Sequence, residues 1–151
     1  MLTLDPGRTT GWSTWEVYDE APIELLDHGQ VRGGLEGFIN AWRHERFGYP
    51  ELVVSESFHL DGRTPKPDVT PLKIEGALAV LCGDVGIPLH YQRNVMKAHA
   101  PDDLLKRSGL WFTGEQHARD AIRHAIAWAK LNGHSPTIGW LWPPPGEKLA
   151  A

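Results

Sequence analysis

The segment LDPGRTTGW, from Leu4 to Trp12, places an aspartate between an apolar run and a turn rich in glycine and threonine. Met1 to Leu4 precedes the Pro-Gly turn, and the residues from Gly11 to Tyr18 alternate with the two-residue period of a β-strand. Two consecutive strands are therefore predicted, with Asp5 at the end of the first. Asp5 can cap the turn by accepting backbone hydrogen bonds, or it can bind a metal ion or a nucleotide.

The order of the remaining segments predicts a mixed α/β sheet. A third strand is expected at 23–31, before the pair Gly33-Gly34, and the later segments alternate between helix and strand. Helices are expected from residue 35 to about 48 and at 72–82, 102–107 and 115–131, and further strands at 52–56 and 87–91. Short connections favour antiparallel pairing of the first three strands, and helical crossovers favour parallel pairing of the last two.

Composition narrows the class of protein. At 151 residues the chain is long enough for one domain and too short for two lobes with separate cores. The single cysteine, Cys82, excludes an internal disulfide and is typical of a reducing compartment. No apolar run approaches the roughly 20 residues that span a bilayer, and no signal-peptide pattern is present, so we expect a cytoplasmic protein without a membrane partner. The net charge of -4 argues against a protein that coats nucleic acid by bulk electrostatics.

Two segments lack a periodic pattern. Residues 59–71 contain three prolines and mixed charge, which predicts a mobile loop. Residues 133–151 carry Trp140, Trp142 and three consecutive prolines, and we expect an irregular C-terminal tail that frays at its end. The folded domain is then expected to comprise residues 1–132.

Four polar residues are candidates for a catalytic site. Asp5 and Glu56 each end a predicted strand, so their carboxylates meet at one edge of the sheet if the strands are neighbours. His117 and Asp120 stand three apart on the last long helix and share one face of it. Carboxylates with one imidazole suit Mg²⁺, with Mn²⁺ as a substitute. Two such ions about 3.5–4 Å apart can activate water and neutralise the leaving oxygen of a phosphodiester, and Asp5 would bridge them.

An ordered set of motifs resembles the RuvC Holliday junction resolvases. The set comprises Asp5-Pro6-Gly7 with Thr10-Gly11-Trp12, Glu56 with Phe58, Gly76 in the helix after the loop, Tyr91 six residues before Lys97, and His117-x-x-Asp120-Ala121. The resemblance extends from residue 1 to about 130. It implies an RNase H-like fold, a homodimer, and a carboxylate cluster that uses Mg²⁺ to nick four-way DNA junctions symmetrically.

The resemblance also implies roles for individual residues. Asp5, Glu56, His117 and Asp120 would be metal ligands and, together with Lys97, the catalytic residues. Lys97 would be a catalytic or phosphate-contacting cation, and Phe58 an aromatic residue that faces the junction. Four cations that flank the predicted site are weaker candidates for DNA contacts, namely Arg63, Lys66, Lys73 and Arg93. The compact chain is also what we expect of a bacteriophage or mobile-element protein acting in the cytoplasm of a bacterial host.

Plainer interpretations stay open for several residues. Glu56 can be a solvated edge residue, His117 a surface residue, and Asp120 a member of an exposed ion pair. His124, one turn beyond Asp120, can join the site, but a position in the core or in contact with a ligand residue is favoured. Trp111 and Phe112 are expected in the core, with a wedge that stacks on bases as the alternative.

Other functions also stay open. The substrate can be a flap or a fork instead of a four-way junction. The glycine-rich turn after Asp5 also resembles the phosphate-binding hairpin of actin-like ATPases and sugar kinases, but those enzymes need a second lobe. A third alternative is a DNA-binding or structural module without catalysis.

Overall fold

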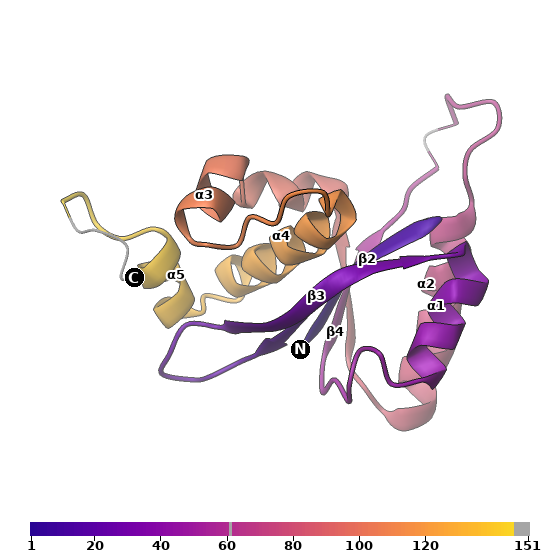
Figure 1. The fold of residues 1–151 in the computed structure, drawn as a ribbon, viewed down its shortest axis with the longest axis horizontal. Coiled ribbons are helices and arrows are strands. Elements are labelled where there is room, and N and C mark those ends of the chain that lie inside the picture. The colour runs from indigo at the N-terminus through magenta and orange to yellow at the C-terminus, as the bar shows by residue number, and fades with distance from the viewer. Residues whose placement is uncertain (61, 147–151) are drawn as a thin grey trace.

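The computed structural model describes residues 1–60 and 62–146, which form one five-stranded sheet with helices on both faces (Figure 1). The strands are β1 (Leu2–Asp5), β2 (Thr9–Glu16), β3 (Glu24–Arg32), β4 (Val53–Ser57) and β5 (Leu89–Arg93). The helices are α1 (Gly34–Arg43), α2 (Thr70–Val85), α3 (Asp102–Arg107), α4 (Gln116–Leu131) and α5 (Ser135–Leu141), with a short 3-10 helix, η1 (Asn94–His99).

The sheet has the order β3-β2-β1-β4-β5. The first three strands pair antiparallel, whereas β4 pairs parallel to both β1 and β5. This confirms the predicted mixed sheet, because short connections join the first three strands and helices join the last ones.

Two cores lie on opposite faces of the sheet. Leu2 and Leu4 pack with Trp12 and Phe38 beneath α1 and α2. The second core lies under α3, α4 and α5, where Trp15 contributes from β2. Since side chains alternate along a strand, Thr3 and Asp5 of β1 point to the other face of the sheet, toward α4.

Buried hydrogen bonds attach α4 to the sheet. Trp15 Nε1 donates to Ser13 Oγ at 2.9 Å, and the Thr3 hydroxyl donates to the carbonyl oxygen of Ala121 at 2.8 Å. The Ser13 and Thr3 hydroxyls lie 2.6 Å apart, so Ser13 is the donor in that pair. These hydrogen bonds satisfy the buried polar side-chain atoms of Thr3, Ser13 and Trp15 and fix the depth of α4 over β1 and β2.

The prediction of an irregular tail is wrong for part of its length. Residues Ser135–Leu141 form α5, with Pro136 in its first turn, where the missing N–H costs nothing. Leu141 is buried in the α4 core, and Trp140 packs against that core. The closely spaced tryptophans and prolines hid the helical period from sequence analysis. The expected fraying at 147–151 lies outside the described residues.

Two smaller differences affect the region around the candidate site. The 3-10 helix η1 was not predicted, and α2 begins at Thr70, earlier than expected. Across the part of the chain that the structure describes, no helix is both long and apolar enough to cross a membrane.

Candidate active site

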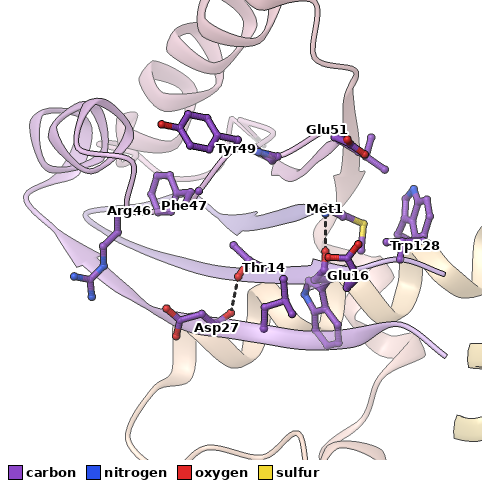
Figure 2. Close-up of a pocket in the computed structure, with 15 residues that line it drawn as sticks. Met1, Thr14, Glu16, Asp27, Arg46, Phe47, Tyr49, Glu51 and Trp128 are labelled. Atoms are coloured by element: carbon purple, nitrogen blue, oxygen red, sulfur yellow. Dashed lines mark hydrogen bonds between the residues drawn. The ribbon is translucent and has the colours of Figure 1, made fainter. Parts of the chain in front are cut away.

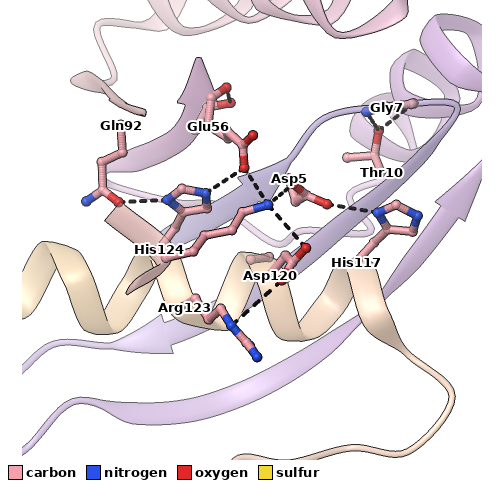
Figure 3. A network of polar contacts seen from close by, with 12 residues as sticks. Asp5, Gly7, Thr10, Glu56, Gln92, His117, Asp120, Arg123 and His124 are labelled. Atoms are coloured by element: carbon pink, nitrogen blue, oxygen red, sulfur yellow. Dashed lines mark hydrogen bonds and ion pairs between the residues drawn. The ribbon is translucent and has the colours of Figure 1, made fainter. Parts of the chain in front are cut away.

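Neighbouring strands bring Asp5 and Glu56 to one edge of the sheet (Figure 3). Leu4 of β1 is the register partner of Ser55 of β4. The residues that follow them, Asp5 and Glu56, therefore lie beside each other. Both carboxylates lie under α4, and Asp5 is only 8% exposed. The strand pairing therefore creates a partly buried acidic site at the carboxyl ends of β1 and β4.

Helix α4 adds a stripe of three polar side chains. His117, Asp120 and His124 follow the i, i+3, i+7 spacing and so lie on the face that covers the sheet. His117 Nδ1 lies 2.9 Å from Asp5 Oδ2, and His124 Nε2 lies 2.9 Å from Glu56 Oε2 (Figure 3). Asp120 stands between the two histidines and also pairs with Arg123, with Nε 3.8 Å from Oδ1.

Glycine at position 11 allows α4 to approach this closely. Gly11 pairs with Asp5 across β1 and β2. A Cβ atom at position 11 would lie 1.8 Å from the carbonyl oxygen of His117, a distance no side chain tolerates. The backbone N–H of His117 also donates to Gln30 Oε1 at 2.9 Å, which anchors the start of α4 to β3.

The Lys97 ammonium lies at the centre of the acidic group. Its Nζ is 2.9 Å from Asp5 Oδ1, 2.6 Å from Glu56 Oε2 and 3.1 Å from Asp120 Oδ2. The lysine reaches this position from η1, and its side chain is 17% exposed. Three carboxylates therefore share one internal cation.

Burial and charge act in opposite directions on the pKa values of the site. Burial raises the pKa of Glu56, but hydrogen bonds from His124 and Lys97 bring it down to about 2. For Asp5 burial dominates and raises the pKa, although Lys97 and His117 act to lower it. Burial lowers the pKa of Lys97, but the Asp5 and Glu56 carboxylates outweigh it and raise that pKa well above its usual value. The site thus favours a bound cation.

The donor set fits a hard divalent cation. Oxygen ligands with one imidazole are those that Mg²⁺ and Mn²⁺ accept in proteins, and the Lys97 ammonium already stands between the carboxylates as a cation. With the lysine in place, no three His, Cys, Asp or Glu side chains within residues 1–60 and 62–146 are arranged as a ready metal site. A metal ion would have to displace the ammonium to bind there.

Comparisons with known proteins identify the fold. No protein-family model matches the sequence, and no curated protein is similar to it in sequence. Thermus thermophilus RuvC in complex with a Holliday junction substrate matches with a TM-score of 0.66 at 18% identity, over 90% of this chain and 97% of that chain. Fowlpox virus resolvase in complex with Holliday junction DNA matches with a TM-score of 0.63 at 9% identity, over 86% and 98%. This chain has the RuvC-type resolvase fold.

A loop projects from the RuvC-type sheet (Figure 1). It runs between β4 and α2, and Phe58 at its start is half-buried, with its backbone N–H donating to Glu75. The candidate DNA-binding cations are all exposed and come from this loop, the first turn of α2 and the end of β5, namely Arg63, Lys66, Lys73 and Arg93. Arg93 is the register partner of Ser57, the residue after Glu56, at the carboxyl end of the sheet.

Trp111 and Phe112 are engaged within the RuvC-type fold itself. The Trp111 ring lies against the Lys106 ammonium at 4.7 Å and the Arg119 guanidinium at 4.3 Å. Phe112 stacks on His28, with ring centroids 3.8 Å apart. Both side chains also pack on the α4 core, which supports a structural role over a wedge.

Two further polar residues near the site are only weakly indicated by the sequence. Gln92 is buried on β5 and contacts the ring of His124, for which only an unspecified core or ligand-contacting role was expected. The signal for His124 was its place seven residues after His117, on the same helical face. Gln92 was visible only as a polar residue one position past a predicted apolar strand.

A separate cavity of about 490 Å³ lies at the opposite end of β1 (Figure 2). Met1, Glu16, Glu51 and Trp128 are among the residues that line it, and none of the predicted site residues does. The Met1 amino group donates to the Trp15 carbonyl oxygen at 2.7 Å at this end of the sheet. The cavity therefore plays no part in the acidic site.

Proposed function

We propose that the protein is a metal-dependent endonuclease that cleaves branched DNA, with the four-way Holliday junction as its substrate. The observation that carries the proposal is the convergence of Asp5, Glu56 and Asp120 on one cation position at the edge of a RuvC-type sheet. The two matched resolvases described as complexes with Holliday junction DNA support this choice of substrate.

Asp5, Glu56, His117 and Asp120 would hold two Mg²⁺ ions, for which Mn²⁺ can substitute. Bound there, the ions would supply activation of a water molecule and neutralisation of the leaving oxygen. With a neutral His117 ring whose Nδ1 donates to Asp5, Nε2 keeps the lone pair that a metal needs. Asp5, between His117 and Lys97, is the candidate for a ligand shared by both ions.

The chain's own cations act on the DNA. Lys97, once released from the carboxylates, would stay beside the same site and contact the scissile phosphate. Arg63, Lys66, Lys73 and Arg93 contact neighbouring phosphates from the exposed rim, which positions the strand without reading its sequence. Phe58, at the base of the projecting loop, faces the junction.

A homodimer would account for symmetric nicking, because a four-way junction with two-fold symmetry presents one scissile phosphate to each subunit. Helix α2 offers an outer face for this contact. Val80 is 61% exposed there, and Gly76 and Gly83 lie on the same face with open space around their Cα atoms. A second copy of α2 could approach such a face closely.

The first prediction concerns cleavage. We expect Asp5→Asn and Asp120→Asn to lower the rate of junction cleavage in Mg²⁺ by at least about 10²–10³-fold while junction binding persists, since each removes one charge from the reacting centre. The measurement is a nuclease assay on a mobile four-way junction with both opposing strands labelled. Asp19→Asn, in the exposed β2–β3 connection, is the matched control and should cut normally. Wild-type rates in either site variant would refute the proposal.

The same preparation decides which branched substrate is preferred. Four-way junctions, three-way junctions, forks and flaps should be compared at equal concentration. A clear preference for the four-way junction with paired nicks supports a resolvase. Equal rates on all substrates would favour a general branched-DNA nuclease, whose selectivity would then have to reside in the loop between β4 and α2.

A further inference from the structure

His124 is a fully buried polar residue, with 0% of its surface exposed, in the middle of α4, directly before the apolar run Ala125–Ala129. It lies between two other polar side chains in Figure 3, Glu56 on one side and Gln92 on the other. Its Nε2 is 2.9 Å from Glu56 Oε2, and its Nδ1 is 2.8 Å from the Gln92 side-chain amide. Both ring nitrogens therefore have a partner inside the protein.

Strand pairing aligns the two outer members of this row. Glu56 of β4 and Gln92 of β5 are register partners in the parallel pair. Partners in register point their side chains to the same face of the sheet, here the face that α4 covers. The imidazole of His124 thus bridges two neighbouring strands from the helix above them.

The backbone of α4 fixes the direction of the hydrogen bonds. The Gln92 amide has the His124 carbonyl oxygen on one side and the Trp128 N–H on the other. Only with its nitrogen toward His124 and its oxygen toward Trp128 does the amide satisfy both, at 3.3 and 3.2 Å. In that orientation the amide nitrogen donates to His124 Nδ1 at 2.8 Å. An acceptor at Nδ1 leaves the proton on Nε2, which donates to the Glu56 carboxylate.

We propose that Gln92 and His124 form a positioning relay that holds Glu56 in the orientation in which it binds metal. This inference rests on the proposed function. Gln92 selects the Nε2–H tautomer of His124, and His124 anchors Glu56 Oε2, so the carboxylate stays in place when Lys97 leaves it. Partners of this kind orient metal-binding carboxylates, and their loss typically lowers metal affinity by about 10–100-fold.

Two substitutions separate positioning from simple filling of the core. In His124→Gln the amide nitrogen reaches about as far as Nε2, so it can still donate to Glu56. In His124→Asn the shorter amide reaches only the Gln92 side. If His124 only filled space, the two variants would have equal effects on Mn²⁺ affinity. If it is part of the relay, glutamine preserves the affinity and asparagine does not. His44→Asn, on an exposed histidine at the end of α1 across the sheet, is the control.

Calorimetric titration of the full chain with Mn²⁺ is the test. We expect His124→Asn to lose about 10–100-fold in affinity, with His124→Gln close to wild type and His44→Asn unchanged. Thermal unfolding confirms that each variant is folded. A long-range ¹⁵N–¹H correlation spectrum of metal-free wild type should place the His124 proton on Nε2, which requires no metal and no activity.

The outcomes keep the two proposals apart. Suppose that wild type binds Mn²⁺ and cuts junctions, but His124→Asn and His124→Gln have the same Mn²⁺ affinity. The relay is then wrong, and the proposal of a nuclease is unaffected. A proton on Nδ1 of His124 would also refute the relay. If wild type neither binds Mn²⁺ nor cuts any branched DNA, the proposed function fails and the relay loses its role with it.

Discussion

Lys97 shows how one residue balances the acidic site in the absence of metal. Its ammonium contacts three carboxylates that would otherwise repel one another in a partly buried setting. Because the lysine is tethered, it competes with any free cation for the same position. In the proposed nuclease, the internal ammonium and external metal ions would therefore compete for one position.

The second prediction follows from this competition. We expect Lys97→Met to lower the free energy of unfolding in EDTA by about 2 kcal/mol, the order of one hydrogen bond to a charged group. The same variant should bind Mn²⁺ more tightly than wild type and regain stability when Mn²⁺ is added. Chemical unfolding with and without Mn²⁺, together with calorimetry, measures both effects. Lys73→Met on the exposed surface of α2 should change neither, and weaker Mn²⁺ binding by Lys97→Met would contradict the competition.

The third prediction concerns Glu56 and pH. Its pKa of about 2 in the folded protein lies below the roughly 4.3 of an unfolded chain, so its charge contributes stability above pH 4.3 that is lost as pH falls toward 2. In EDTA, wild type should exceed Glu56→Gln in unfolding free energy at pH 6, and the difference should shrink at pH 3. Urea unfolding at the two pH values measures it. A difference that does not change with pH would show that the Glu56 carboxylate gains nothing from His124 and Lys97.

At the scale of elements, the site depends on how closely α4 lies on β1 and β2. The Thr3–Ser13–Trp15 hydrogen bonds fix the middle of the helix, and Gly11 leaves room for its first turn. His117 comes from that first turn and Asp5 from the strand below. A shift of the helix would therefore separate the imidazole from its carboxylate.

The fourth prediction tests this contact between elements. Gly11→Ala puts a methyl group against the His117 backbone, so we expect it to lower the unfolding free energy by about 1–3 kcal/mol, as overpacking does, and to weaken Mn²⁺ binding. Chemical unfolding and calorimetry measure the two losses. Gly139→Ala in α5 has open space around it and should be neutral or stabilising. Equal stability of the two variants would mean that α4 can move without cost.

The sheet can be predicted from the sequence because its signals are local. Strand alternation, the break at Gly33-Gly34 and the helical period of 115–131 are each visible within a few residues. The strand-end rule and the three-residue spacing of His117 and Asp120 were enough to place four polar residues together. The central position of Lys97 could not be predicted, because it depends on η1, a short 3-10 helix without a sequence pattern of its own.

The Gln92–His124 contact shows the other limit of sequence reasoning. It requires the register between β4 and β5, together with the height of α4 above them, and neither is encoded near either residue. The helix α5 was missed for a different reason, since its stabilisation comes from burial of Leu141 against α4. These features depend on tertiary packing and have no local sequence pattern that would predict them.

For the whole molecule, charge is distributed unevenly. The chain has a net charge of -4, yet the loop that follows β4, the first turn of α2 and the end of β5 carry exposed cations. DNA bound at this edge would place a phosphate next to the carboxylates only if cations screen them. Metal binding and DNA binding are thus expected to support one another at one edge of the RuvC-type fold.

The fifth prediction concerns assembly. Val80 stands between Gly76 and Gly83 on the outer face of α2, where a second copy of the helix would bury it. We expect Val80→Glu to give a monomer, because two buried carboxylates would face each other across a two-fold axis without partners. Sedimentation equilibrium measures the mass. Val85→Glu, on another face at the end of α2, is equally exposed and should leave the wild-type mass unchanged. On a junction with both opposing strands labelled, Val80→Glu should still nick DNA, but its two nicks should no longer occur as a pair. A wild-type protein that sediments as a monomer would refute the dimer.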